Sequence, residues 1–288
     1  MVRTSPRRAP VTRIPVVLSI AGSDSGGGAG IQADLKAFAH AGVHGTTAIT
    51  ALTAQNTQGV TGIHPVPPDF VVEQVRAVAT DLGVGAVKIG MLGDAPVIEA
   101  VAKALDELDE GTPVVVDPVM VAESGARLLP PDAEQALIDL ILPRATVVTP
   151  NMPEARALTR RAAPEARGGG REEEDEAAAL ARAVHALGPA WVVLTGGHRR
   201  EATDLVWNGR DLVQLPGERH PDGAAHGSGC THSSTLAAHL AKGDDPLEAA
   251  RAAKRAASEA VRNGLRELGQ GAGPVDVLGL RSATSALP

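Results

Sequence analysis

Two glycine-rich segments of the chain contain residue types suited to binding phosphate. The first runs from Gly22 to Gly30, and the second is Gly227-Ser228-Gly229, which ends at Cys230. Glycines let successive backbone N–H groups point at one spot, and the start of a following helix adds partial positive charge. The second segment therefore predicts an anion hole for a phosphoryl group in transfer, although an ordinary first helical turn would also fit it.

Neither segment matches a better-known nucleotide or nucleophile motif. No Gly-Lys-Ser/Thr follows at the spacing that a Walker A loop requires. Ile31 occupies the position of the third glycine of a dinucleotide fingerprint, and Asp24 occupies the serine position of a nucleophile elbow. These departures disfavour a P-loop ATPase, a dehydrogenase and a serine hydrolase.

Cys230 is the one cysteine of the chain. An internal disulfide and an all-cysteine zinc site are therefore excluded. A lone cysteine is usually a small buried apolar residue. At a helix N-terminus, however, the pKa of a thiol falls. Because Gly-Ser-Gly precedes it, we expect Cys230 to be functional and its pKa to be lowered, which would make it a competent base or anion.

Two carboxylates are candidates for holding Mg²⁺, which prefers few carboxylates, several waters and the phosphates themselves. Asp117 stands before Pro118 at a predicted strand end, where a purely structural role is hard to find. Glu154 follows Pro153 and could instead cap the helix that begins there. We expect Asp117 to be a metal ligand and keep both interpretations of Glu154.

Two further polar residues belong to predicted strands. Gln55 ends an apolar strand, and its amide offers a donor and an acceptor side by side. This pattern matches the edge of an aminopyrimidine, but a strand-end amide can equally bond to the backbone. Lys88 lies within a strand and receives only a weak assignment.

The elements that must position these residues follow from the hydrophobic pattern. Strands are expected at 14–21, 46–54, 86–89, 114–116, 146–148 and 191–194, and a hairpin at 202–208 and 212–215. Helices are expected at 30–41, 68–82, 96–108, 133–142, 228–241 and 246–268. This alternation predicts a single α/β domain from residue 14 to 288, with a mostly parallel sheet covered by helices on both faces. Ligands of such sheets bind beyond the carboxyl ends of the strands, where the candidate residues stand.

Composition excludes several classes of protein. The chain has 27 basic and 34 acidic side chains and a net charge of −7, which disfavours nucleic acid and anionic membranes as partners. No apolar run approaches the length of a membrane span. Residues 1–13 are predicted to be a disordered tail rather than a secretory signal, and 160–175 a flexible insertion. A cytoplasmic protein is expected.

Seven segments together resemble one family, the hydroxymethylpyrimidine/phosphomethylpyrimidine kinases of thiamine biosynthesis. They are IAGSDSGGGAGIQADLK (20–36), ITALTAQNT (49–57), KIGML (88–92), DPVM (117–120), TPNMPEA (149–155), GGH (196–198) and HGSGCT (226–231). The resemblance covers about residues 14–268. Each motif alone is weak, whereas the set is highly specific.

The resemblance implies a ribokinase-like fold, a homodimer, and ATP-dependent phosphorylation of 4-amino-5-hydroxymethyl-2-methylpyrimidine, followed by conversion of the monophosphate to the diphosphate. It implies that the anion hole is Gly227, Ser228, Gly229 and Cys230, with Cys230 where the wider superfamily places a catalytic aspartate. The implied substrate-binding residues are Gln55, Gly22, Asp34, Met91 and Met120. Those implied for ATP are Asn151, Thr195 and Gly197, with Mg²⁺ near Asp117 and Glu154.

The chain also departs from the family pattern. Glu123 stands where many relatives carry lysine, and Thr195 stands where several relatives carry lysine. The rivals are a pyridoxal kinase of the same fold, whose substrate also carries a hydroxymethyl group on a six-membered ring, and a non-catalytic pyrimidine sensor. A hydroxyethylthiazole kinase is a weaker rival, because its loop resembles the second glycine segment but its opening does not resemble the first.

Overall fold

The computed structural model describes residues 14–121, 128–161 and 170–284. The predicted tail at 1–13, Glu123 and residues 162–169 of the predicted insertion lie outside this part of the chain. Residues 170–175 of that insertion are helical and begin α6.

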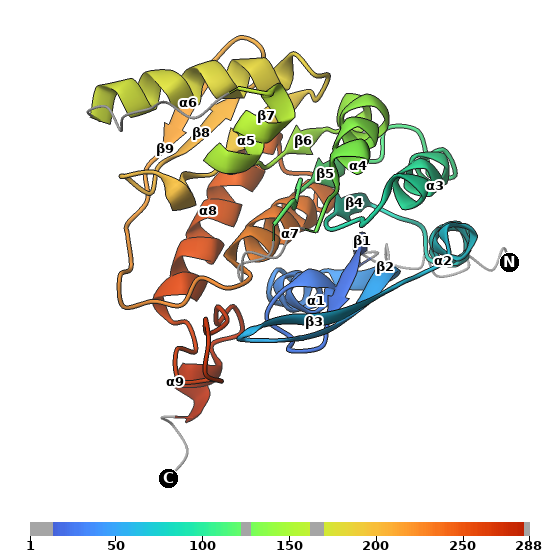
Figure 1. The fold of residues 1–288 in the computed structure, drawn as a ribbon, viewed down its shortest axis with the longest axis horizontal. Coiled ribbons are helices and arrows are strands. Elements are labelled where there is room, and N and C mark those ends of the chain that lie inside the picture. The colour runs from blue at the N-terminus through green and yellow to red at the C-terminus, as the bar shows by residue number, and fades with distance from the viewer. Residues whose placement is uncertain (1–13, 122–127, 162–169, 285–288) are drawn as a thin grey trace, which may run out of the picture.

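The described strands form one sheet in the order β3-β2-β1-β4-β5-β6-β7-β8-β9 (Figure 1). The strands from β2 to β7 in this order are parallel, and β3, β8 and β9 at the two edges are antiparallel. Their bounds are β1 Val16–Asp24, β2 His44–Asn56, β3 Gly59–Pro65, β4 Ala86–Ile89, β5 Val114–Val116, β6 Val147–Val148, β7 Trp191–Leu194, β8 Asp204–Trp207 and β9 Leu212–Leu215. The predicted mostly parallel sheet and its edge hairpin are confirmed.

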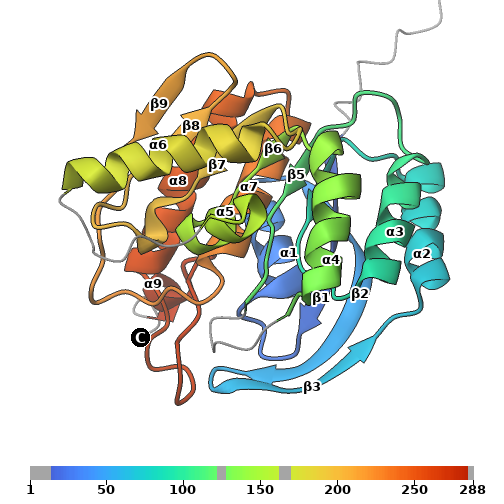
Figure 2. The same cartoon turned by 45° about the horizontal axis from the view of Figure 1, so that its top comes forward.

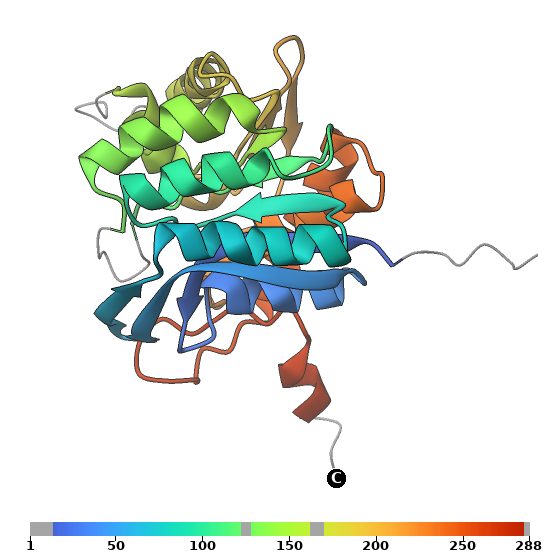
Figure 3. The ribbon, with the colours of Figure 1, turned by 90° about the vertical axis from the view of Figure 1, so that its right-hand side faces the viewer.

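Helices cover both faces of this sheet (Figure 2). One face carries α1 Gly30–His40, α7 Ser228–Ala241 and α8 Pro246–Arg262. The other carries α2 Pro68–Asp81, α3 Ala95–Leu105, α4 Pro131–Ala136 with the turns η1 Leu137–Ile141 and η2 Leu142–Arg144, α5 Met152–Thr159 and α6 Gly170–His185. A short helix, α9 Leu280–Thr284, lies beyond both layers (Figure 3). None of the described helices combines the length and the apolar character needed to cross a membrane.

The central strands are apolar because each of their faces is covered. In β5, Val114 and Val116 pack into the core beneath α2 to α6, and Val115 packs into the core beneath α1, α7 and α8. This alternation follows from the two-residue period of a strand. Short unbroken apolar runs, rather than alternating patterns, are therefore the signature of the strands that end at the site.

The structure differs from the predicted elements in several places. Helix α3 ends at Leu105 instead of 108, and α9 was not predicted. Strand β3 was not predicted, because most of its residues are exposed and its sequence has no apolar alternation. Helix α8 ends at Arg262 instead of continuing to 268. Asn263 and Gly264 follow directly after Arg262. None of these differences moves a strand end that faces the site.

Candidate active site

The carboxyl ends of the parallel strands open into a cavity of about 390 Å³. The first residues of helix α7 also line this cavity. Most of the predicted site residues line the cavity, namely Gly22, Gln55, Met91, Asp117, Asn151, Glu154, Thr195, Gly197, Gly227, Ser228, Gly229 and Cys230. The sequence rule that ligands bind at this edge therefore locates the cavity.

Two predicted substrate-binding residues are not in the cavity lining. Asp34 on α1 is completely buried behind the wall, and Met120 packs into the apolar core beneath α2 to α6. Both residues adjoin segments that line the cavity. In this structure neither Asp34 nor Met120 is among the residues that line the cavity, and their predicted roles stay predictions.

The two glycine-rich segments contact each other directly. Gly227 has a φ of +82°, and a Cβ atom there would lie 1.9 Å from the carbonyl oxygen of Gly28. A Cβ atom on Gly28 would in turn lie 2.3 Å from Cδ2 of His226. No side chain fits between the loops, so glycine is required for close backbone approach as well as for the left-handed φ. The two segments form a single backbone cradle.

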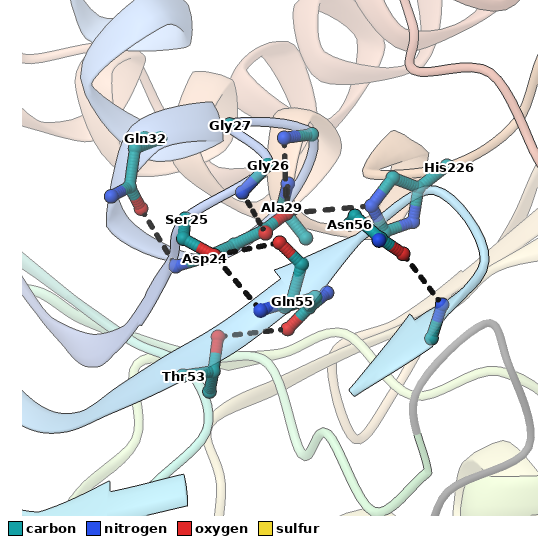
Figure 4. Close-up of polar contacts among 12 residues, drawn as sticks. Asp24, Ser25, Gly26, Gly27, Ala29, Gln32, Thr53, Gln55, Asn56 and His226 are labelled. Carbon is teal, nitrogen blue, oxygen red and sulfur yellow. Dashed lines mark hydrogen bonds and ion pairs between the residues drawn. The ribbon is translucent and has the colours of Figure 1, made fainter. Parts of the chain in front are cut away.

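Asp24 fastens this cradle together (Figure 4). Its Oδ1 accepts the N–H of Gly26 at 2.7 Å, and its Oδ2 accepts those of Gly28 at 3.0 Å and Ala29 at 2.8 Å. Nε2 of His226, from the second loop, lies 3.5 Å from Oδ2. Burial alone would raise the pKa of Asp24, but His226 and these N–H groups lower it below its usual value. A carboxylate at the end of β1 thus links both loops, a role that the sequence did not reveal.

Gln55 is held at the end of β2 by its backbone and by one side-chain contact (Figure 4). Its N–H donates to Oγ of Ser25 at 2.8 Å, and that hydroxyl donates to the carbonyl oxygen of Gln55 at 2.6 Å. Oγ1 of Thr53, whose hydroxyl also donates to the carbonyl oxygen of Ser23 at 2.8 Å, lies 3.1 Å from Oε1. Among the described residues, nothing accepts a hydrogen bond from the NH₂ group of Gln55, so this donor is free to meet a ligand in the cavity.

A buried ion network lies beneath the cradle. Nζ of Lys88, on β4, lies 2.9 Å from Oδ1 of Asp34 and 3.9 Å from Oδ2 of Asp117. Burial would lower the pKa of Lys88, but Asp34 and the other acidic groups around it raise the pKa well above its usual value. Serine hydroxyls complete the network: Ser19 and Ser234 donate to Asp34, and Ser233 donates to Asp117. The sequence supported only a weak assignment of Lys88, whereas the structure places it in the cavity lining and in this ion network.

The Cys230 thiol does not have the lowered pKa that its place on a helix predicts. The residue is half-buried, and the N–H of Gly30 donates to its sulfur. Burial raises the pKa to about 12; Lys88 opposes this rise, whereas Asp34 and Asp117 add to it. The helix N-terminus is therefore outweighed by burial and two carboxylates, and the expectation of a lowered pKa is wrong for the ligand-free protein.

Glu154 caps the helix that begins after Asn151, and its role as a metal ligand stays a prediction. Its Oε2 accepts the N–H of Asn151 at 2.9 Å while its own N–H donates to Oδ1 of Asn151 at 2.9 Å, which is a capping box at the start of α5. Glu154 also lines the cavity. Burial, followed by the charge of Asp117, raises its pKa to about 8, although the Asn151 N–H opposes the rise.

The carboxylates of Asp117 and Glu154 suit a divalent cation. Burial also raises the pKa of Asp117, in spite of Lys88 and Ser233. Both shifts mean that added positive charge would stabilise the ionised pair. No cluster of three or more acidic, histidine or cysteine ligands occurs in the described structure. A site of two carboxylates fits Mg²⁺, which takes its remaining ligands from water and phosphates.

The far half of the cavity contains a second charged cluster that the sequence did not reveal. Oδ1 of Asp204, at the start of β8, accepts the N–H of Gly196 at 2.7 Å and Nζ of Lys254 at 2.6 Å. His232 on α7 faces the same carboxylate. Burial would raise the pKa of Asp204, but His232 and Lys254 lower it. Side chains of α8 complete this wall, including Ala257 and Ser258.

A mostly parallel sheet between two helical layers, with a glycine cradle at the start of a helix, is the arrangement expected of a kinase of the ribokinase-like fold. The sequence profile of the family described as "Phosphomethylpyrimidine kinase" matches residues 24–276. A "Hydroxymethylpyrimidine/phosphomethylpyrimidine kinase" from Rhizobium meliloti (strain 1021) is 50% identical over 263 residues, 90% of this chain and 96% of that protein. The chain belongs to the phosphomethylpyrimidine kinase family.

Solved structures agree with this assignment. The ADP complex of Bacillus subtilis pyridoxal kinase superposes with a TM-score of 0.81 at 36% identity, covering 93% of this chain and 99% of the other. A phosphomethylpyrimidine kinase from Clostridium difficile 630 gives a TM-score of 0.73 at 36% identity, covering 85% and 99%. The predicted family, fold and ATP-dependent phosphotransferase activity are confirmed.

Substituting Gly227→Ala should separate the two loops and disable the cradle. We expect kcat/KM to fall about 10²-fold, the usual effect of losing preorganised N–H donors. Gly243→Ala is the matched control, because Gly243 also has a positive φ of +94° but nothing lies within 4 Å of its Cβ position. That variant should lose about 1 kcal/mol of stability and retain activity. Equal activity of the two variants would contradict the contact between the loops.

Proposed function

We propose that the chain uses ATP to phosphorylate 4-amino-5-hydroxymethyl-2-methylpyrimidine and then its monophosphate, which yields the diphosphate for thiamine diphosphate biosynthesis. One observation carries the proposal: the free NH₂ group of Gln55 and the cradle of Gly227 to Cys230 line the same cavity. The cavity volume of about 390 Å³ lies in the range of small-molecule sites. The names of the relatives support the same substrate class.

In the first step, the hydroxymethyl oxygen forms a bond to the γ-phosphorus while the bond from that phosphorus to the β–γ bridging oxygen breaks and ADP leaves. Gln55 fixes the pyrimidine edge, so that the alcohol points towards the cradle. The N–H groups of Gly227, Gly229 and Cys230 bind the charge that develops on the transferring group, which is the main task of a phosphoryl-transfer enzyme. The N–H of Ser228 instead donates to the carbonyl oxygen of Ala225 at 2.9 Å. Holding the two reactants together supplies much of the remaining acceleration.

We assign to Cys230 the role of the base that takes the proton of the attacking hydroxyl. Mg²⁺, held by Asp117 and Glu154, would supply positive charge beside the phosphates. With Asp117 engaged in this way, one of the two carboxylates that add to the effect of burial is neutralised, so that less opposes the effect of Lys88 and the pKa of the thiol falls. Asn151, Thr195 and Gly197 lie on the nucleotide side of the cavity.

A homodimer and a cytoplasmic location complete the proposal. The β2–β3 hairpin supports the dimer, because it exposes Leu52 at 46% on one face and Ile63 at 52% on the other, and the outer edge of β3 pairs with no other described strand. A cytoplasmic location is supported because ATP is supplied in the cytoplasm and a phosphorylated product is used there.

An ATP-coupled assay with the aminopyrimidine alcohol, in which monophosphate and diphosphate are resolved, tests the function. We expect both products in sequence, and turnover faster than with pyridoxal. Cys230→Ala should lower kcat by about 10²-fold or more, as for loss of a general base. Faster turnover of pyridoxal would overturn the proposed substrate. Activity of Cys230→Ala within a few-fold of wild type would remove the thiol from the mechanism.

Substituting Gln55→Leu should affect one substrate selectively. The change leaves the polar edge of the bound pyrimidine unpaired, so KM for the pyrimidine should rise by about 10²-fold while KM for ATP stays within twofold. Gln58→Leu is the control, since Gln58 is exposed and lies outside the cavity lining. Equal losses for both substrates would place Gln55 elsewhere in the site.

A further inference from the structure

The loop that follows α8 contacts the site from outside without lining it. Residues 265–274, here called the C-terminal loop, run beside the tip of the β2–β3 hairpin (Figure 2). The two ends of the loop are joined, because the N–H of Leu265 donates to the carbonyl oxygen of Pro274 at 2.8 Å. None of its residues is among those that line the cavity. Closed loops of this kind are frequently functional, yet no step of the phosphoryl transfer uses this one.

The base of the C-terminal loop lies against both glycine-rich segments of the cradle. The N–H of Val275 donates at 3.0 Å to the carbonyl oxygen of His226, which stands just before the second segment. Pro274 also forms an isolated β-bridge with His226. A Cβ atom on Gly28, in the first segment, would lie 3.3 Å from Cβ of Pro274. The base of the loop is therefore fixed to the cradle itself.

The tip of the C-terminal loop packs on the turn of the β2–β3 hairpin. A Cβ atom on Gly271 would lie 1.9 Å from the carbonyl oxygen of Thr57, and one on Gly269 would lie 2.3 Å from Oγ1 of Thr57. The N–H of Gly271 donates to the same Oγ1 at 3.2 Å. Nε2 of Gln58 donates to Oε1 of Gln270 at 3.0 Å. Only glycine allows this approach, so the backbones of the loop and of the turn are in direct contact.

Thr57 stands two residues after Gln55, at the end of the hairpin. Most residues of β3 are exposed, and a two-stranded hairpin without a packed face is marginally stable, so this end needs other support. The first glycine-rich segment gives some of it, because Oγ of Ser25 bonds to the backbone of Gln55. A Cβ atom on Gly26 would lie 3.1 Å from Cα of Asn56. The hairpin end is thus held by the first segment and by the C-terminal loop.

We propose that the C-terminal loop is a positioning element that sets the place of Gln55 relative to the cradle, acting through Thr57. The loop touches the cradle with its base and the hairpin turn with its tip, so it spans the two groups that hold opposite sides of the reacting bond. A misplacement of about 1 Å lowers the rate of such a reaction by about 10²-fold. The inference rests on the proposed function, because it takes Gln55 as the group that binds the pyrimidine.

Substituting Gly271→Ala tests the proposal, since the new methyl group must push the loop and the turn apart. We expect kcat/KM for the aminopyrimidine alcohol to fall about tenfold while KM for ATP stays within twofold. Gly62→Ala is the matched control on the same hairpin, because its Cβ atom would lie 3.6 Å from Cβ of Ala54, an ordinary contact. It should change neither value. An unchanged Gly271→Ala, or the same loss in both variants, would overturn the proposal.

A double-mutant cycle with Gln55→Leu separates positioning from a general disturbance of the fold. If the loop acts through Gln55, Gly271→Ala should cost less than twofold in kcat/KM for the pyrimidine once Gln55 is replaced, because the two changes remove the same interaction. A further tenfold loss in the Gln55→Leu protein would show that the two residues act independently and would overturn the proposal.

Thr57 provides a second test if Gly271→Ala fails to fold. Thr57→Val removes the acceptor of the Gly271 N–H at nearly constant shape and should lower kcat/KM for the pyrimidine about fivefold, the effect of one hydrogen bond. Thr57→Ser keeps the hydroxyl and should retain most of the activity. Equal activity of Thr57→Val and wild type would count against the loop. A wild type that does not phosphorylate the aminopyrimidine alcohol would instead refute the proposed function.

Discussion

The site depends on one buried cation placed between two carboxylates. The side chains of Lys88 and Asp34 are fully buried, and that of Asp117 is 7% exposed. Removing buried charges from water is costly unless they compensate each other. One ammonium group compensates two carboxylates here only in part, so the region beneath the cradle keeps an excess of negative charge. Burial is the main cause of the raised pKa values of Cys230 and Glu154, and this excess adds to it through Asp34 and Asp117 at Cys230 and through Asp117 at Glu154. It also suits a divalent cation beside bound phosphates, as proposed above.

The same network joins the elements that make the cradle. Asp34 belongs to α1, Lys88 to β4 and Asp117 to the end of β5, while Ser233 and Ser234 come from α7. These contacts fix the N-terminus of α7 over the sheet edge. With α7 in place, its first glycine meets the loop that follows β1, and Asp24 and His226 fasten the two loops. The position of the N–H groups that bind the transferring phosphoryl therefore follows from buried electrostatics as much as from the glycines themselves.

The sequence predicted those features that depend on local pattern. Short apolar runs located the strands from β4 to β7, and the rule for their carboxyl ends located Gln55, Asp117 and Asn151 at one cavity. Features that join distant segments were not predictable. Lys88 meets Asp34 across 54 residues, and the cluster of Asp204, His232 and Lys254 comes from three separate elements. The pKa of Cys230 shows the difference clearly. Its place at a helix N-terminus is visible in the sequence, whereas its burial beside two carboxylates is visible only in the fold.

The unfolding free energy of Lys88→Met as a function of pH tests this central role of Lys88 most directly. The variant leaves the buried carboxylates uncompensated, which should lower the unfolding free energy by about 3–5 kcal/mol at pH 7. Asp117, whose pKa burial already raises, should bind a proton in the folded variant above the pH at which it does so in the unfolded chain. The folded state then binds more protons, so the deficit should shrink as the pH is lowered from 7 to 5. Lys103→Met, on the exposed side of α3, should show no such change. A Lys88→Met deficit that is absent, or that stays constant across this pH range, would contradict the account.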